Sequence, residues 1–362
     1  MRNHQEMKNR IRVGILGATG AVGQKFVELL DGHPWFEITE LIASERSAGK
    51  SYRDATGWLG RKAIPDTMAN VTVRGVKEKS DCDIVFSGVD SSVATELESG
   101  YASEGLSVIS NARNFRMDPT VPLLIPEVNP EHVSLIKSQT WPNDGFIITN
   151  PNCSTVGVVC SVKPLFDAFG LQALHVTTMQ ALSGAGYPGV SSLDIQGNVL
   201  PFIAGEEEKV ETEPLKILGT FVDSVPSPVV NNEEFAISAQ CNRVSVVDGH
   251  LISISVRFKE NASLEDVESA FRNFNSPSEV AGLPSSPDEF LTFFEDPNGP
   301  QPVRHVMLGG GMTVSVGRLK RCSVLDYRFV ALVHNTIRGA AGGAILNAEL
   351  LVSKGLIKSR AN

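Results

Sequence analysis

A glycine-rich turn near the N-terminus constrains this chain more than any other feature. Residues 12–16 (RVGIL) form an apolar run typical of a buried strand, and residues 24–30 (QKFVELL) have a helical pattern. Between them, Gly17 allows a tight turn, Gly20 lets the backbone approach a phosphate, and Gly23 lets the helix pack closely on a sheet. The helix start adds unpaired N–H groups and a positive dipole end. We therefore predict a dinucleotide site at Gly17, Thr19, Gly20, Ala21, Val22 and Gly23.

Further strand signals follow along the first half of the chain. Apolar runs at residues 36–43, 83–89, 106–110 and 146–150 are typical of buried strands, and a helical stretch separates the second run from the third. Strands that alternate with helices indicate a parallel sheet covered on both faces. The first half is therefore predicted to be an α/β domain with a Rossmann-type, doubly wound parallel sheet.

The pattern changes after Asn150. Residues 154–169 have a helical pattern, and in residues 252–258 apolar and polar side chains alternate, as in an antiparallel sheet with one solvated face. A length of 362 residues favours two domains over one. We expect a dinucleotide-binding domain at residues 1–152, an α+β catalytic domain with a large, mainly antiparallel sheet at 153–334, and a helix at 335–362.

The composition excludes several classes of protein. Lys and Arg total 32 against 41 for Asp and Glu, and a net charge of −9 argues against a nucleic-acid or anionic-membrane surface. No apolar run reaches about 18 residues, so we expect no membrane span, and residues 1–10 lack the apolar stretch of a signal peptide. The five cysteines are odd in number and lack metal-type spacing, which favours free thiols, no metal site and a cytoplasmic protein.

The end of the second predicted strand bears on which dinucleotide is bound. An NAD site usually presents a carboxylate to the ribose 2′-hydroxyl, whereas an NADP site favours arginine and hydroxyl donors. Residues 44–47 (SERS) contain both kinds of group, since Glu45 would repel a 2′-phosphate and its neighbours would bind one. We expect NADP, held by Ser44, Arg46 and Ser47; a solvated polar loop is the alternative.

Cys153 lies between a predicted strand end and a predicted helix start, in the segment NPNCST. A helix dipole stabilises a thiolate at the helix N-terminus, and such positions lower a cysteine pKa from about 8.5 to roughly 3.5–7.5. Because the thiolate is the nucleophilic form, we predict that Cys153 is a catalytic nucleophile. The other cysteines are predicted to be packing residues: Cys82, Cys160, Cys241 and Cys322.

A cysteine nucleophile needs a proton acceptor, usually a histidine. His250 follows Asp248 and Gly249, which form a strong signal for a two-residue hairpin. In that register Val247 pairs with His250, and Arg243 projects from the same face about 13 Å away along the strand. The two side chains would then converge on a small anionic substrate, with the planar guanidinium binding a carboxylate.

Three loops carry further candidate ligands. Gln180 precedes a glycine-rich turn where the backbone can approach a ligand, and we assign Ser183 and Gly184 in this turn to cofactor binding. Residues 205–209 (GEEEK) would offer an acid to an amine and a lysine to a phosphate, with a solvated charge run as the alternative. Residues 110–116 (SNARNFR) follow the carboxyl end of a parallel strand, where ligands bind in such sheets.

Together these motifs resemble the aspartate-semialdehyde dehydrogenase family, and most closely its archaeal and fungal branch. The resemblance spans nearly the whole chain. The motifs occur in the expected order: GATGAVG, SERSAGK, SNARNFRMD, VPLLIPEVN, NPNCST, QALSGAGYPG, GEEEK and RVSVVDGH. It implies NADP-dependent reduction of L-4-aspartyl phosphate to L-aspartate 4-semialdehyde, with release of inorganic phosphate, in the pathway to lysine, methionine, threonine and isoleucine. It also implies a Rossmann domain completed by the C-terminal helix, and a homodimer or homotetramer formed through the sheet of the second domain.

The resemblance implies catalytic roles for three residues and a cofactor-binding role for a fourth. Cys153 matches the family's nucleophile, which forms a thioester, and His250 matches its acid/base. Gln180 resembles the glutamine that orients the thioacyl intermediate. Asn335 matches an asparagine that lies near the nicotinamide.

Substrate-binding roles follow from the same resemblance. Arg243 resembles the arginine that binds the substrate carboxylate, and Glu206 the acid that holds its amine. Three consecutive glutamates leave the register open, so Glu207 remains an alternative to Glu206. Lys209 and Arg116 resemble the phosphate-binding pair. We also expect a substrate contact from Asn114, which lies two residues before Arg116.

Two other functions remain open from the sequence. One is a related acyl reductase, such as a malonyl-CoA reductase or an enzyme similar to N-acetyl-glutamyl-phosphate reductase. The other is a non-catalytic dinucleotide-sensing protein. Arg243, Glu206 and Lys209 favour a small amino-acid phosphate over an acyl-CoA. The presence of Cys153 and His250 argues against a protein that has lost its chemistry.

Overall fold

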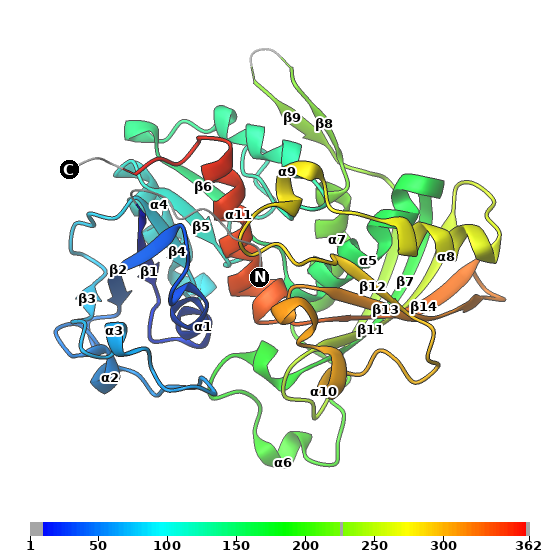
Figure 1. The fold of residues 1–362 in the computed structure, drawn as a ribbon, viewed down its shortest axis with the longest axis horizontal. Coiled ribbons are helices and arrows are strands. Elements are labelled where there is room, and N and C mark those ends of the chain that lie inside the picture. Colours follow the sequence, from blue (N-terminus) through cyan, green and yellow to red (C-terminus); the bar gives the residue numbers. More distant parts are fainter. Residues whose placement is uncertain (1–9, 225–226, 360–362) are drawn as a thin grey trace.

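The computed structural model describes residues 10–224 and 227–359 and contains two large sheets (Figure 1). The first sheet has six strands in the order β3-β2-β1-β4-β5-β6, and each neighbouring pair is parallel. Its strands are β1 (Ile11–Leu16), β2 (Phe36–Ala43), β3 (Arg74–Gly75), β4 (Ile84–Ser87), β5 (Ser107–Ser110) and β6 (Phe146–Thr149). This is the strand order of a doubly wound dinucleotide-binding sheet, so the predicted Rossmann-type fold is confirmed.

Helices cover both faces of this sheet. Phe86 and other inward residues of one face pack with α1 (Ala21–Leu30) and α11 (Gly342–Ser353), and Val85 packs toward α4 (Ser91–Ser103) on the other face. Figure 1 shows α11, coloured red, beside the blue and cyan strands of the N-terminal sheet. The last helix of the chain therefore shares a core with the first 150 residues.

The C-terminal helix is shorter than the predicted range 335–362, of which residues 360–362 lie outside the described residues. A π-helical turn, Ile337–Ala341, precedes α11, which ends at Ser353. Within this turn Gly339 lies directly against Cys153, since a Cβ on Gly339 would stand 2.7 Å from the Cβ of Cys153. The turn brings the chain past the candidate nucleophile before the regular helix begins.

The second sheet is mixed, with the strand order β10-β7-β11-β14-β13-β12. Its strands are β7 (Leu171–Gln180), β10 (Ala236–Arg243), β11 (His250–Phe258), β12 (Leu291–Phe294), β13 (Val314–Arg321) and β14 (Tyr327–Val333). Three of its five pairings are antiparallel. On β11, Ile252 and Ile254 are buried beneath α5 (Cys153–Phe169), whereas Ser253 and Arg257 are exposed on the opposite face. The predicted alternation of buried and exposed side chains in residues 252–258 is confirmed.

The predicted hairpin at Asp248 and Gly249 is wrong. β7 lies between β10 and β11, pairing in parallel with the former and antiparallel with the latter. The connection from β10 to β11 is held instead by residues that follow β7, because Leu182 N–H donates to Val246 O (2.7 Å) and Ser183 N–H donates to Val247 O (3.1 Å). A turn signal describes only a local bend, and it does not determine which strand takes the neighbouring place in the sheet.

The remaining elements are shorter or lie around these two sheets. Strands β8 (Thr220–Val222) and β9 (Val229–Asn231) form an antiparallel pair. The other α-helices are α2 (Tyr52–Ala55), α3 (Asp66–Ala69), α6 (Ser192–Ile195), α7 (Glu206–Ile217), α8 (Leu264–Asn273), α9 (Ser278–Ala281) and α10 (Pro302–His305). In the described part of the chain, no helix has both the length and the apolar character needed to cross a membrane. None of the five cysteines is in a disulfide.

Candidate active site

Cys153 and His250 form the centre of the site. Cys153 is the first residue of α5, and its Sγ lies 3.2 Å from His250 Nε2. The other ring nitrogen, Nδ1, accepts the N–H of Ala181 at 3.0 Å. In the neutral imidazole the proton therefore resides on Nε2, because Nδ1 is occupied as an acceptor. The structure thus presents an N–H donor to the sulfur and to any oxygen bound next to it.

The surroundings of Cys153 oppose the lowering of its pKa that the helix start predicts. Burial raises the pKa of the Cys153 thiol to about 12, and the charge of Glu206 raises it further, against the opposing charge of Lys209. The residue is partly exposed, yet protein atoms surround the sulfur closely enough for desolvation to prevail. Burial likewise lowers the pKa of His250 to about 3. Burial therefore disfavours the charged form of both groups when no substrate is bound.

A buried carboxylate stands beside the nucleophile. Glu206, the first residue of α7, accepts hydrogen bonds from Asn152 Nδ2 (3.1 and 3.0 Å) and Gln180 Nε2 (3.1 Å), and it pairs with Lys209. Burial by itself would raise the pKa of Glu206, but the Lys209 ammonium and these hydrogen bonds hold it below its ordinary value. An ionised, buried carboxylate of this kind suits a cationic ligand group.

Glu207 does not share this position. Its Oε1 accepts the backbone N–H of Cys241 on β10 at 3.1 Å. One turn later Glu211 accepts the N–H of Ala239 on the same strand at 3.0 Å. These two glutamates therefore cover the edge of the sheet. Of the two glutamates that the sequence left open, the structure brings Glu206 to the cysteine.

Arg243 reaches the site from the end of β10. It is paired with Gln180 across the β10–β7 ladder, and its Nη1 donates to the carbonyl of Ala181 at 2.8 Å. Arg243 and His250 both lie under Gly184, because a Cβ on Gly184 would stand 2.9 Å from Arg243 Nη1 and 3.0 Å from His250 Cε1. The predicted convergence of these side chains is present, although it comes from two strands that flank β7.

The two candidate phosphate-binding cations lie on either side of Asn152. Arg116 is buried and donates to Glu213 Oε1 (2.8 Å), while Glu213 Oε2 accepts the N–H of Asn152 (2.8 Å). Lys209 connects to the amide of Asn152 through Glu206. Arg116 and Lys209 therefore belong to one network around the residue that precedes the nucleophile.

Asn114 is not part of this network. Its side chain is exposed and donates to Ser91 O (2.9 Å) and Thr95 Oγ1 (2.7 Å) at the start of α4. The structure therefore does not bring this predicted substrate ligand to the others. Asn114 and Arg116 point in different directions. The Arg116 side chain turns inward to Glu213, whereas the Asn114 side chain bonds to α4 at the surface of the first domain.

The glycine-rich turn has the geometry that a dinucleotide phosphate requires. Gly17 has a φ of +83°, and a Cβ on Gly23 would stand 2.2 Å from Gly17 O. No side chain caps α1 at Gly20, so the first N–H groups of the helix, from Ala21, Val22 and Gly23, have no side-chain cap of their own. Thr19 is half-buried in the same turn. These residues fit a dinucleotide pyrophosphate.

Ser44, Arg46 and Ser47 follow β2, the strand next to β1. Ser44 and Arg46 are exposed, and Ser47 N–H donates to Ser44 O at 2.8 Å, which closes the turn. The carboxylate of Glu45 lies beside Gly75, since a Cβ there would stand 3.3 Å from Glu45 Oε1. The loop therefore has the position that a ribose-binding loop takes in such folds.

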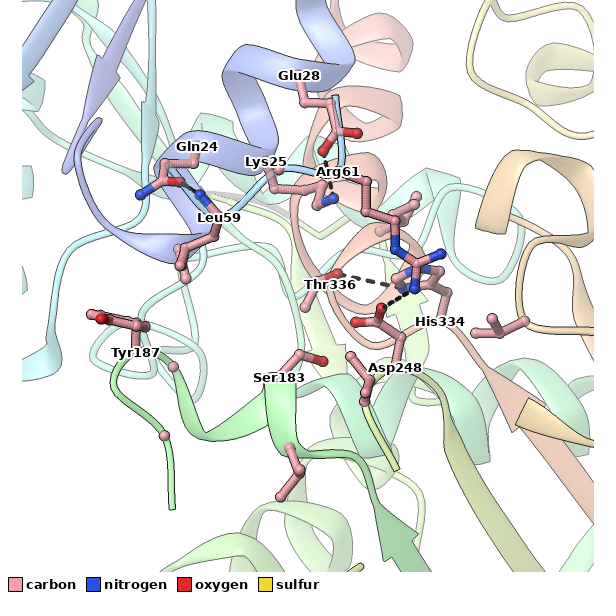
Figure 2. Close-up of a pocket in the computed structure, with 18 of the residues that line it drawn as sticks. Gln24, Lys25, Glu28, Leu59, Arg61, Ser183, Tyr187, Asp248, His334 and Thr336 are labelled. Carbon is pink, nitrogen blue, oxygen red and sulfur yellow. Dashed lines mark hydrogen bonds and ion pairs between the residues drawn. The ribbon is translucent and has the colours of Figure 1, made fainter. Parts of the chain in front are cut away.

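A pocket of about 450 Å³ extends from the start of α1 to the segment before His250 (Figure 2). Ala21 and Lys25 line it from α1, and Ser183 and Asp248 line it from the second domain. Asn335 joins this region to the site, because its Nδ2 donates to Ser183 Oγ (2.8 Å) and its Oδ1 accepts the N–H of Gly249 (2.9 Å). The predicted cofactor residues Ser183, Gly184 and Asn335 are therefore brought together.

Several lining and supporting residues were missed by sequence reasoning. Arg61 pairs with Asp248 at 3.3 Å across the pocket, as Figure 2 shows, although nothing in the sequence around Arg61 indicates a site. Glu213 was also missed. Asn152 could have been found, because asparagine is a favoured N-cap and it directly precedes the cysteine.

Comparison with known proteins gives consistent matches along the chain. Residues 12–136 match the family described as semialdehyde dehydrogenase, NAD binding domain, and residues 162–338 match semialdehyde dehydrogenase, dimerisation domain. A relative from Schizosaccharomyces pombe, named aspartate-semialdehyde dehydrogenase, is 48% identical and covers 96% of this chain and 99% of its own length. A relative of the same name from Archaeoglobus fulgidus is 46% identical and covers 96% of this chain and all of its own length, 100%.

Solved structures agree with these matches. The crystal structure of aspartate semialdehyde dehydrogenase with NADP from Candida albicans has a TM-score of 0.88 and 44% identity, covering 96% of this chain and 100% of that one. Aspartate semialdehyde dehydrogenase II complexed with ASA from Vibrio cholerae has a TM-score of 0.75 and 28% identity, covering 95% of this chain and 99% of that one.

Proposed function

This chain belongs to the aspartate-semialdehyde dehydrogenase family, and we propose that it reduces L-4-aspartyl phosphate to L-aspartate 4-semialdehyde with NADPH, releasing NADP and inorganic phosphate. The observation that carries this proposal is the contact between Cys153 Sγ and His250 Nε2, next to an ionised, buried Glu206 and to Arg243. A nucleophile, a proton-exchanging group and two opposite fixed charges are what an amino-acid acyl group requires.

The reaction runs through a covalent bond to Cys153. The Cys153 thiol attacks the acyl carbon of aspartyl phosphate, the carbon–oxygen bond to phosphate breaks, and the thiol proton leaves with the departing phosphate, so that a thioester remains. When bound, NADPH supplies the hydride that reduces this thioester. His250, whose protonated Nε2 faces the sulfur, gives this proton to the departing sulfur as the carbon–sulfur bond breaks and the aldehyde leaves, and it regains a proton from solvent. Covalent capture divides one difficult step into two easier ones.

The substrate is oriented by groups that surround this bond. Arg243 binds the α-carboxylate and Glu206 binds the α-ammonium. Gln180, held against Glu206, orients the thioester. Arg116 and Lys209 bind the phosphate. Asn152 supports this division of roles because it joins the two sets of side chains. Its side-chain amide donates to Glu206, and its backbone N–H donates to Glu213, the partner of Arg116.

The dinucleotide is NADP in this proposal. Its pyrophosphate lies at the turn from Gly17 to Gly23, and its 2′-phosphate is bound by Ser44, Arg46 and Ser47. Ser183, Gly184 and Asn335 contact its nicotinamide end. The pocket between α1 and Asp248 supports this placement, because it leads from the turn toward Ser183.

The wider assignments follow the same proposal. Residues 1–152 form the NADP-binding domain, of which 1–9 lie outside the described residues, and 335–362 complete it, while 153–334 form the catalytic domain. The protein is a cytoplasmic homodimer or homotetramer that pairs through the second sheet. The exposed polar face of that sheet, with His175, Ser253 and Arg257, supports such pairing. Sedimentation measures the assembly directly.

One assay tests the proposed reaction. The purified protein is expected to reduce NADP when given aspartate semialdehyde and inorganic phosphate, and to oxidise NADPH with aspartyl phosphate but not with malonyl-CoA. Cys153→Ala is expected to abolish turnover and leave NADP binding intact. Mass spectrometry of acid-quenched wild-type enzyme should find an acyl adduct on Cys153. Substantial turnover in Cys153→Ala, or faster oxidation with the acyl-CoA, would overturn the proposal.

A further inference from the structure

Helix α7 carries a second set of charged side chains along the face that bears Glu206 and Lys209. Glu213 and Lys216 follow at the spacing that keeps residues on one side of a helix, and both are buried. Glu213 bonds Arg116 and the N–H of Asn152. The roles proposed above assign no function to Lys216.

Lys216 has an unusual environment for a lysine. Its Nζ donates to three backbone carbonyls, those of Arg116 (2.7 Å), Asp118 (2.6 Å) and Val121 (2.8 Å). An ammonium has three N–H donors and no acceptor, so these three oxygens use its full capacity. Buried lysines are ordinarily paired with a carboxylate, whereas the ammonium of Lys216 donates to three backbone carbonyls of a single loop, residues 116–121.

We propose that Lys216 is a positioning residue for the phosphate step: it holds the 116–121 loop so that Arg116, with its guanidinium aligned by Glu213, faces the phosphate. This inference rests on the proposed function, in which Arg116 binds phosphate. Lys216 contacts neither substrate nor nucleophile, and it acts by fixing the backbone of Arg116 from one side while Glu213 fixes the side chain from the other.

The charge state of Lys216 provides a readout that a merely structural lysine would not show. Burial lowers the pKa of Lys216 to about 8, although Asp118 and Glu213 oppose the shift. The charged and titratable groups around it are Arg116, Asp118, His132, Glu213 and Glu234. Above about pH 8 the neutral amine has two N–H donors for three carbonyls, so the loop loses one of its anchors.

Steady-state kinetics in the phosphate-consuming direction test this role. Lys216→Met removes all three donors, and we expect its KM for phosphate to rise about tenfold or more while its KM for NADP stays within about twofold of wild type. Lys216→Arg keeps a charge that does not titrate in this range. We expect it to bind phosphate nearly as wild type does and to lack the wild-type rise of KM for phosphate above about pH 8. Glu208→Gln, exposed on the same helix, is the matched control.

The outcomes separate this inference from the proposed function. If wild-type protein shows no phosphate-dependent reduction of NADP, the proposed function fails. If wild type is active, an unchanged KM for phosphate in Lys216→Met, or a uniform fall in all kinetic constants, overturns the positioning role. Should Lys216→Met fail to fold, the pH dependence of the KM for phosphate in Lys216→Arg decides. If that KM rises above about pH 8 as it does in wild type, the inference is overturned.

Discussion

Asn152 donates its side-chain amide to both carboxylate oxygens of Glu206, at 3.1 and 3.0 Å. Its Oδ1 meanwhile accepts the N–H groups of Ser154 and Thr155, at 2.9 and 3.2 Å, at the start of α5. One side chain therefore caps the helix that begins with the nucleophile and orients the carboxylate proposed to hold the substrate amine.

These two contacts of Asn152 can be separated by substitution. Asn152→Ala loses the cap, and we expect a loss of about 0.5–2 kcal/mol in the free energy of unfolding. Asn152→Ser keeps a capping oxygen and should unfold near the wild-type temperature, yet it removes the donors to Glu206. Both variants should lower kcat/KM for aspartate semialdehyde. Thermal melts with parallel kinetics check this, and wild-type kcat/KM in the serine variant would contradict the role of the Glu206 contact.

The raised pKa of Cys153 predicts how its alkylation depends on pH. With a thiol pKa of about 12, the thiolate fraction of the substrate-free enzyme increases tenfold per pH unit across the neutral range. We expect the rate of modification by iodoacetamide to rise steadily between about pH 6 and pH 9 without a plateau. Mass spectrometry of the peptide that contains Cys153 measures this rate. A plateau below about pH 8 would mean that the sulfur is already a thiolate at rest.

Gly184 is predicted to tolerate no side chain, because a Cβ there would meet Arg243 Nη1 at 2.9 Å and His250 Cε1 at 3.0 Å. Gly184→Ala should displace one of these groups and reduce kcat/KM by about tenfold or more, while the fold is retained. Gly100→Ala is a suitable control, since it is exposed in α4 and a Cβ there meets nothing within 4 Å. The control should keep full activity and gain about 0.5–1 kcal/mol of stability. Equal activity in the two variants would show that the space above Arg243 and His250 is not needed.

Cofactor selectivity is predicted to depend on Arg46. In Arg46→Ala the 2′-phosphate of NADP loses a charged partner, whose hydrogen bond is typically worth about 1.5–3 kcal/mol. We therefore expect the KM for NADP to rise by roughly tenfold or more, with little change in the KM for NAD. Kinetics with both dinucleotides check this. A parallel rise for NAD would indicate that Arg46 acts on the shape of the loop and not on the phosphate.

The first sheet could be predicted closely because each of its signals is local. The strand from Ile11, the glycine turn and the helix from Ala21 lie within one short stretch, and the strand endings at Ala43 and Ser110 are marked by the residues that follow them. The second sheet was harder to predict from the sequence. The chain does bend at Val247 and Asp248, but β7, which ends some 60 residues before Arg243, takes the place next to β11.

The order of residues along the chain was sufficient to indicate the family, the two kinds of sheet and the chemical groups Cys153, His250, Arg243 and Lys209. It was not sufficient for their surroundings. The raised pKa of Cys153, the position of Glu206 rather than Glu207 beside it and the separation of Asn114 from the other candidates arose only in the folded chain. Desolvation and charge at one atom depend on groups that distant segments bring within a few ångströms of it, and no spacing along the chain records that arrangement.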